Sequence, residues 1–237
     1  MEWRDEAIVL SVRRHGESSA VVDLLTQSRG RHSGLVRGAQ SKANRGVLLP
    51  GNRVAAWWRA RLAEQLGALK CELTDAAAAR AMDDPGRLAA LSSACALAEA
   101  ALPERQPHPA TFAALGALLD SLATEAWPTV YVHWELALLR DLGYGLDLSC
   151  CAATGVNDGL AYVSPRSGRA VSLSAGEAWR DRLLPLPRFL VAGGEGDAAQ
   201  VQEGLALAEW FLERHVFGPH AIALPPARTR LVDRLKS

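Results

Sequence analysis

The sequence of 237 residues contains no uncharged run of the roughly 18 to 20 apolar residues that a membrane-spanning helix requires. Its first stretch, MEWRDEAIVLSVRR, is acidic ahead of a short apolar run, which reverses the order of charges in a secretory signal peptide. We therefore expect a cytoplasmic protein without a membrane partner.

Cysteine is scarce, and the placement of its four residues argues against a disulfide scaffold. Cys71 and Cys95 are isolated in apolar stretches, where a thiol serves as a small apolar side chain. Cys150 and Cys151 are neighbours, which rarely bridge each other without strain. A structural zinc ion usually takes two pairs of Cys or His ligands, and SGRAVSLSAG, where a second pair would fall, has neither. We expect no disulfide, metal or other cofactor.

The motifs of common enzyme classes are also missing. The glycine-rich AGGEGD at 192–197 precedes a helical pattern but lacks the GK[ST] ending that grips nucleotide phosphates. No HExxH motif or nucleophile elbow occurs. A nuclease is also disfavoured, because no cluster of carboxylates for two metal ions is evident. We therefore expect a protein without catalytic residues.

Charge of one sign is not in excess, since 26 basic residues balance 26 acidic ones. The balance is nevertheless uneven along the chain. Residues 1–70 contain 12 Lys and Arg but 6 Asp and Glu, which gives +6 there and −6 in the remainder. Such asymmetry indicates a polyanionic partner for the basic part.

The first 75 or so residues contain five short runs rich in β-branched or large apolar side chains. They span 7–12, 20–26, 32–38, 53–60 and 66–73. Turn sequences such as HGESS and AQSKANRG separate them, and no helix-length pattern intervenes. This spacing favours a small barrel or sandwich, which we place at residues 1–77.

Helical periodicity follows, so the fold class is α+β with a second, α-helical domain at 78–237. The first helix should begin at Asp84-Pro85, a capping residue followed by proline at the first helical position. The expected helices cover about 85–102, 109–126, 128–142, 174–184, 197–217 and 225–236. Residues 144–173 break the pattern and predict a small, irregular β-like lobe.

Cations gather in or beside the turns of the β segment, above all in GLVRGAQSKANRG at 34–46. Cations contact phosphates, and aromatic faces can stack on bases of any sequence. Because side chains alternate along a strand, at most one of Trp57 and Trp58 can face outward. The candidate DNA-binding residues are Arg13, Arg14, Arg29, Arg31, Arg37, Lys42, Arg45, Trp58 and Arg59.

Three segments of the chain carry a resemblance to a known family. The first, AIVLSVRRHGESSAVVDLLTQSRGRHSGLVRGAQSK, consists of apolar strands with basic turns. In the second, ELALLRDLGYGLDLSCCAATG, a helix ends in LGYG and a cysteine-bearing lobe starts. The third, ARTRLVDRL, is a basic last helix. These segments resemble the corresponding parts of the bacterial RecO family of recombination mediators, and the resemblance covers essentially the whole chain in the expected order.

The resemblance implies an N-terminal OB fold, an α-helical C-terminal domain and, in many members, a zinc lobe with four cysteines. Only Cys150 or Cys151 matches the first cysteine pair, and the second pair is missing. We therefore expect a degenerate zinc-finger-like lobe without metal. Gln40 stands where the family often has a basic residue, so that loop is expected to hold DNA less firmly.

The resemblance also implies a function: a non-enzymatic mediator that binds single- and double-stranded DNA and is associated with the nucleoid. It would anneal complementary strands coated with single-strand-binding protein (SSB) and, with RecR, help to load RecA. Trp134, Leu138 and Arg140 are candidates for binding the acidic, apolar-ended tail of SSB; plain core and surface positions are the alternative. A second hypothesis is a protein-interaction adaptor whose barrel binds a protein instead of nucleic acid.

Overall fold

The computed structural model describes residues 1–62 and 65–236, and its internal contacts divide them into two compact units. The barrel unit comprises Met1–Ala123 with Pro225–Leu231. The lobe unit comprises Thr124–Leu224 with the last residues from Val232. The boundary expected after residue 77 stays a prediction, because the barrel unit also contains helices that follow the barrel.

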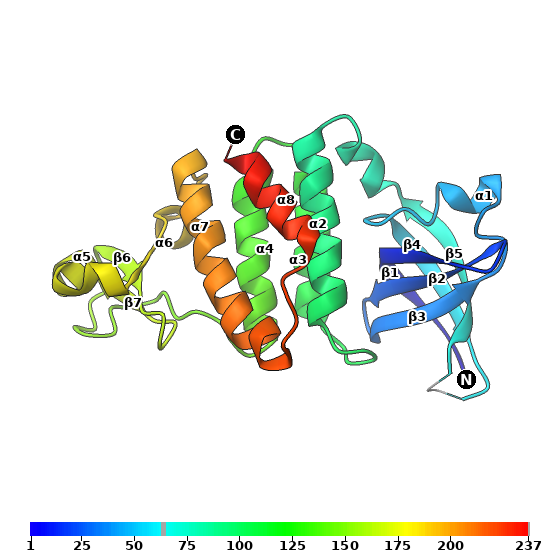
Figure 1. The fold of residues 1–237 in the computed structure, drawn as a ribbon, viewed down its shortest axis with the longest axis horizontal. Helices are drawn as coiled ribbons and strands as arrows, with labels where there is room; N and C mark the ends of the chain where they lie inside the picture. Colours follow the sequence, from blue (N-terminus) through cyan, green and yellow to red (C-terminus); the bar gives the residue numbers. More distant parts are fainter. Residues whose placement is uncertain (63–64, 237) are drawn as a thin grey trace. The chain divides into compact units, whose positions relative to one another are not determined.

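Five strands form a closed barrel in the order β1-β2-β3-β5-β4, in which only the β3–β5 pair is parallel (Figure 1). This topology is that of an OB fold, which confirms the expected fold class. The long first strand pairs with β4 through its first half and with β2 through its second half. The strands span Glu2–His15, Ser19–Thr26, Gly30–Val36, Arg53–Arg59 and Gly67–Asp75.

The barrel interior is filled by the inward-facing positions of these strands. Along β4, Val54, Ala56 and Trp58 point inward in strict alternation, and each is at most 2 % exposed. Gly67 on β5 leaves room for the Trp58 indole, because a Cβ at that position would overlap the ring. The alternation that predicted the strands is therefore the pattern that fills the core.

Two longer helices accompany the barrel: α2 (Pro85–Ala101), which packs on β1 and β2, and α3 (Pro109–Ser121). The start of α2 is confirmed, since Asp84 accepts hydrogen bonds from the N–H groups of Gly86 (2.7 Å) and Arg87 (3.0 Å). A one-turn helix, α1 (Lys42–Arg45), follows β3, and a 3₁₀ turn, η1 (Ala77–Ala81), precedes α2.

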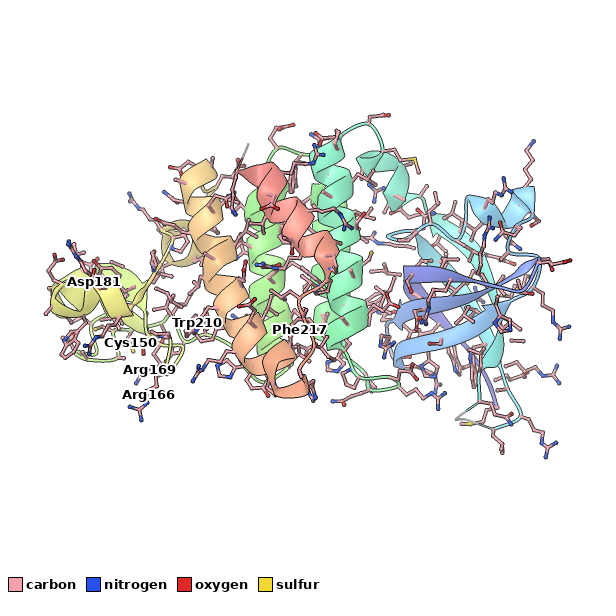
Figure 2. The ribbon with its side chains drawn as sticks, in the orientation of Figure 1. Cys150, Arg166, Arg169, Asp181, Trp210 and Phe217 are labelled. Atoms are coloured by element: carbon pink, nitrogen blue, oxygen red, sulfur yellow. The ribbon has the colours of Figure 1, made fainter. Side chains whose placement is uncertain are left out.

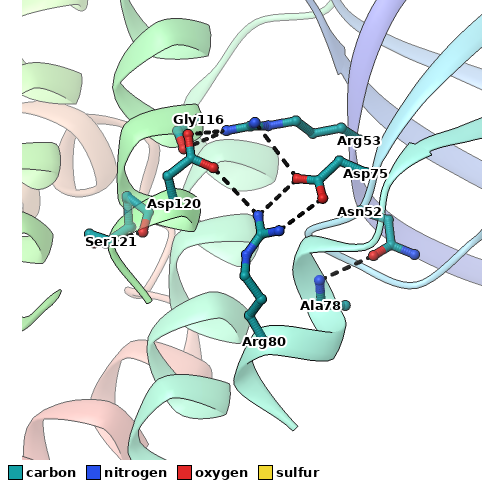
Figure 3. Close-up of polar contacts among 9 residues, drawn as sticks. Asn52, Arg53, Asp75, Ala78, Arg80, Gly116, Asp120 and Ser121 are labelled. Atoms are coloured by element: carbon teal, nitrogen blue, oxygen red, sulfur yellow. Dashed lines mark hydrogen bonds and ion pairs between the residues drawn. The ribbon is translucent and has the colours of Figure 1, made fainter. Parts of the chain in front are cut away.

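A polar network joins the barrel to α3 within the barrel unit (Figure 3). Arg80 donates to both carboxylate oxygens of Asp75 at 2.8 Å. Arg53, at the start of β4, donates to the carbonyl of Gly116 at 2.7 Å and to Asp120 at 2.8 Å. These charge-assisted contacts fix the orientation of the barrel against α3.

The lobe unit contains α4 (Trp127–Asp141) and α7 (Ala198–Phe211), which pack on each other. The expected β-like lobe is present as a three-stranded sheet: β6 (Leu160–Val163), β7 (Ala170–Ser172) and β8 (Leu184–Pro185). Shorter elements complete the chain: α5 (Leu173–Gly176), η2 (Glu177–Arg182), α6 (Phe189–Ala192), η3 (Leu212–Phe217) and η4 (Gly218–His220). The last helix, α8 (Pro226–Leu235), begins in the barrel unit.

Three helix predictions need correction. The helix expected at 109–126 ends at Ser121, and 174–184 is mainly the 3₁₀ helix η2. The helix expected at 197–217 changes to π-helical turns from Leu212. None of the helices in the described residues is both long and apolar enough to span a membrane.

Candidate nucleic-acid interface

Five of the candidate cations belong to one region of the barrel. Strand pairing sets Arg14 opposite Ala20, and Ala20 opposite Val36, so the end of β1 and the end of β3 lie at the same end of this sheet. With strands about 4.8 Å apart, the backbones at Arg14 and Val36 are about 10 Å apart. Helix α1 follows within six residues of Val36. We call Arg13, Arg14, Arg37, Lys42 and Arg45 the loop cluster.

The loop that carries three members of this cluster, Arg37, Lys42 and Arg45, is anchored by hydrogen bonds and by core residues. Ser41 caps α1 by accepting a hydrogen bond from the N–H of Asn44 (3.3 Å), and the Asn44 amide donates to the carbonyl of Gly38 (3.0 Å). Ala39 and Leu48, on either side of α1, are part of the barrel core. The prediction of a turn-rich connection missed α1, although a capping serine ahead of a helix former is a local signal for it.

The cations of the loop cluster are exposed, and within the described ranges 1–62 and 65–236 four of them form no ion pair: Arg14, Arg37, Lys42 and Arg45. Arg13 binds the buried carboxylate of Asp23 at 2.6 Å, yet 65 % of its side chain remains exposed. Unpaired, exposed cations on an anchored loop can contact phosphates without first breaking internal bonds.

Arg31 differs from the other candidate cations in being mostly buried and ion-paired. Its side chain is only 17 % exposed and lies close to two carboxylates, Asp23 (3.3 Å) and Glu104 (3.6 Å). It also donates to the carbonyl of Leu102 at 2.9 Å. Because Asp23 is fully buried, it needs this cationic partner inside the barrel unit. The structure therefore places Arg31 in the internal polar network, where it shares the Asp23 carboxylate with Arg13.

Trp58 is also an internal residue, so its assignment as a base-stacking side chain is corrected. It is 2 % exposed, and its indole N–H donates to the carbonyl of Ser33 at 3.1 Å. Its ring stacks on Trp3, with centroids 5.7 Å apart, and His32 contacts both rings edge-on. A ring enclosed in this way has no free face for a base.

Trp57 is the partly exposed member of the pair, on the outward face of β4. Pairing across the barrel sets Arg4 of β1 on one side of it and Lys70 of β5 on the other. The guanidinium carbon of Arg4 is 4.9 Å, and the Lys70 ammonium 5.3 Å, from a Trp57 ring centroid. The exposed Arg59 lies on the same outward face, so this second basic surface includes two cations, Arg4 and Lys70, that the sequence analysis missed.

Arg29 lies apart from the loop cluster, at the turn between β2 and β3, where Thr26 pairs with Gly30. It lines a hollow of about 250 Å³ together with Arg105, His32 and Trp3. Burial lowers the pKa of His32, because desolvation disfavours the charged ring. His32 Nδ1 lies 3.2 Å from the carbonyl of Arg29, which makes that nitrogen the protonated one.

Comparisons with known proteins decide which family these features belong to. Residues 1–77 match the family Recombination protein O N terminal, and residues 82–221 match Recombination protein O C terminal. The chain belongs to the RecO family of DNA repair proteins. A DNA repair protein RecO from Rhodospirillum centenum is 61 % identical over 238 residues, which cover 100 % of this chain and 95 % of the relative. One from Rhodospirillum rubrum is 50 % identical over 244 residues, covering 100 % and 97 %.

The small lobe expected at 144–173 contains two cysteines that form no disulfide. Cys150 and Cys151 are both free thiols, and Cys150 lies in the lobe with Arg166 and Arg169 (Figure 2). The buried Cys151 sulfur accepts a hydrogen bond from the N–H of Ser172 at 3.3 Å, and its bonds with Ser172 and Thr154 lower the pKa of the thiol. Nowhere in residues 1–62 and 65–236 do three or more Cys, His, Asp or Glu side chains gather as metal ligands would.

Two of the three candidate SSB-tail residues are core residues of the lobe unit. Trp134 and Leu138 on α4 are 2 % and 0 % exposed, so neither can form the floor of an open groove. Arg140, two residues beyond Leu138 on α4, is exposed and lines a hollow of about 330 Å³. The other residues of this hollow are Leu136, Leu146, Asp147, Leu148, Ser149 and Leu190.

Proposed function

We propose that this RecO-family chain is a non-enzymatic recombination mediator that binds single- and double-stranded DNA and anneals complementary strands coated with SSB. With RecR it would help to load RecA, acting in the cytoplasm at the nucleoid. The observation that carries the proposal is the loop cluster, in which the exposed Arg37, Lys42 and Arg45 stand on an anchored loop of an OB barrel and Arg14 lies near the end of β1.

The chemistry of the loop cluster supports contacts with the DNA backbone. Its exposed side chains are Arg and Lys, which bind phosphate oxygens whatever the base sequence. The loop has no aromatic side chain that could read or stack on a base. A mediator that acts on gaps of any sequence must bind DNA without regard to its base sequence.

Annealing of complementary strands tests the proposal, with and without SSB. The wild-type chain should accelerate annealing in both reactions, and replacement of Arg37, Lys42 and Arg45 by Glu should abolish the acceleration. Intact annealing by that triple variant would favour the adaptor hypothesis, in which the barrel binds a protein. Strand cleavage in the presence of Mg²⁺ would overturn the non-enzymatic assignment.

The hollow beside Arg140 offers a site for the acidic, apolar-ended tail of SSB. Four leucines, at 136, 146, 148 and 190, supply the apolar part of its lining, and Arg140 supplies a cation for a carboxylate. Asp147, which also lines the hollow, forms a 3.3 Å ion pair with Arg169, so its charge is partly neutralised. We propose this hollow in place of the groove predicted around Trp134.

A synthetic peptide with the SSB tail sequence tests this site. Arg140→Glu should weaken peptide binding about tenfold or more, because it replaces attraction by repulsion next to apolar walls. Arg166→Glu is the matched control, since Arg166 is an exposed arginine of the same unit that does not line the hollow. Equal losses in the two variants would contradict a site at Arg140.

A further inference from the structure

The hollow that Arg29 lines lies between the start of β1, the turn from β2 to β3 and the linker that joins α2 to α3. Its volume is about 250 Å³, which is below the range of small-molecule sites and suits a single side chain of a partner. We call it the linker hollow. Its lining residues are Met1, Trp3, Ser28, Arg29, His32, Trp58, Arg105 and Pro107.

This lining combines the residue types that concentrate at the centre of protein–protein interfaces. Four of the eight side chains are apolar, two are arginines, and none is acidic. Tryptophan, methionine and arginine are enriched in interface cores, whereas lysine and acidic residues are depleted there. A surface that holds phosphates, in contrast, needs exposed cations and no apolar lining. The lining therefore favours a protein partner over nucleic acid.

The two arginines of the linker hollow can both bind an anion. Within residues 1–62 and 65–236 neither Arg29 nor Arg105 forms an ion pair, and the adjacent Glu104 lies 3.6 Å from Arg31 instead. Burial is the main cause that lowers the pKa of His32, and the charges of Arg105 and Arg29 add to it. Both charges therefore act on the same hollow, where they attract an anion.

The backbone of the linker is strained at Arg105. Its φ of 63° lies in the left-handed region, which is unfavourable for an arginine. The Arg105 N–H donates to the carbonyl of Arg31 at 2.8 Å, and the Gln106 backbone packs so closely on Gly30 that a Cβ there would overlap it. The linker is thus held against the start of β3. Because glycine would adopt this backbone without strain, an arginine here points to a use of its side chain outside the packing of the fold.

We propose that the linker hollow docks an acidic segment of a partner protein, whose carboxylate binds Arg105 and Arg29 while an adjacent apolar side chain packs on the partly exposed Trp3. A guanidinium holds a carboxylate through two parallel hydrogen bonds, and a recessed pair is stronger than one in open solvent. The inference does not rest on the DNA contacts of the proposed function, because none of these lining residues belongs to the loop cluster.

Two blocked peptides that differ in charge alone, Leu-Glu-Glu-Leu and Leu-Gln-Gln-Leu, test the site in the full-length chain. The parent chain carries Arg140→Glu, so that the proposed SSB-tail site does not contribute. It should bind the glutamate peptide about tenfold or more tightly than the glutamine peptide. Arg105→Glu should remove this preference by replacing attraction with repulsion, and Arg105→Lys should keep part of it. Equal binding of the two peptides by the parent chain would overturn the proposal.

Arg45→Glu is the matched control, since Arg45 is an exposed arginine of the barrel unit that does not line the hollow. It should keep the preference for glutamate and weaken binding of a single-stranded oligonucleotide, which Arg105→Glu should weaken much less. Equal DNA losses in the two variants, with the peptide preference intact in both, would assign the hollow to phosphates and overturn the proposal. Normal DNA binding by Arg45→Glu would count against the proposed DNA contacts alone.

Arg105→Gly separates binding from stability. Because glycine adopts a φ of 63° without strain, this variant should unfold at a urea concentration no lower than that of the parent chain. It should nevertheless lose the preference for the glutamate peptide, since the guanidinium is gone. A lower urea midpoint would show that the Arg105 side chain stabilises the fold, and a retained preference would place the carboxylate site elsewhere. Either result would overturn the proposal.

Discussion

At the scale of single residues, the surroundings of an arginine decide whether it contributes to binding or to stability. Arg31 and Arg37 are six positions apart: Arg31 lies in strand β3, and Arg37 directly follows its end. Arg31 is 17 % exposed between carboxylates, whereas Arg37 is exposed at the start of the loop. Only an exposed, unpaired cation can exchange its counterions for DNA phosphates at little cost.

Replacing each of these arginines by alanine should therefore affect different measurements. Arg31→Ala leaves the buried Asp23 without one of its cations and should lower the free energy of unfolding in urea by about 2 kcal/mol. Arg37→Ala should change stability by less than about 0.5 kcal/mol. It should, however, reduce the slope of log affinity against log salt by about 0.7 for single-stranded DNA. A reduced slope with Arg31→Ala at unchanged stability would contradict this division.

Part of this residue-level picture could be read from the sequence. Val54, Ala56 and Trp58 share one face of β4, and the polar Arg53 and Arg59 share the other, so alternation could have assigned Trp58 to the core, although the sequence analysis listed it as a DNA-binding candidate. The contribution of Arg4 and Lys70 could not be read in this way. They approach Trp57 only because β1 and β5 pair with β4, and local sequence does not specify which distant strands pair.

At the scale of elements, the contact of the barrel with α3 depends on the charges of a small polar network (Figure 3). Asp75 at the end of β5 receives two hydrogen bonds from Arg80, and Arg53 lies 3.7 Å from it. The hydrogen bonds from Arg80 lower the pKa of the Asp75 carboxyl. The ionised form of Asp75 therefore stabilises the folded unit.

Asp75→Asn should lower the free energy of unfolding by about 1 kcal/mol at pH 7, since the side chains involved are partly exposed. Because the folded pKa lies below the unfolded one, this contribution is complete above the unfolded value and is lost as pH falls through the folded value. The difference between wild type and variant in urea unfolding should therefore shrink below about pH 4. Asp83→Asn, at an exposed carboxylate, is the control, and a difference that grew on acidification would refute the account.

The elements differ in how well the sequence predicts them. The five strands and α2 follow from alternation and from the Asp84-Pro85 start signal, because these patterns record which side chains are buried. The π-helical turns at Leu212–Phe217 and the 3₁₀ turns at Glu177–Arg182 do not follow. They differ from an α-helix by one step in hydrogen-bond register, and side-chain periodicity hardly records that difference.

At the scale of the whole molecule, the uneven charge along the chain gives the account its central claim. Residues 1–70, which form most of the barrel, carry +6, and the remaining residues carry −6. The zero net charge therefore conceals a barrel suited to a polyanion. If the loop cluster makes the DNA contacts, binding must be driven largely by counterion release. The slope of log affinity against log salt is then proportional to the number of phosphates contacted.

The most direct test measures single-stranded DNA affinity from about 50 to 200 mM salt for the wild-type chain and for a variant with Arg37, Lys42 and Arg45 replaced by alanine. Each phosphate contact adds about 0.7 to the slope of log affinity against log salt, so the variant should have a slope smaller by about 2. Its loss of affinity should be similar for every DNA sequence tested, because these cations contact phosphates and not bases. An unchanged slope, or wild-type binding that does not weaken with salt, would contradict the account.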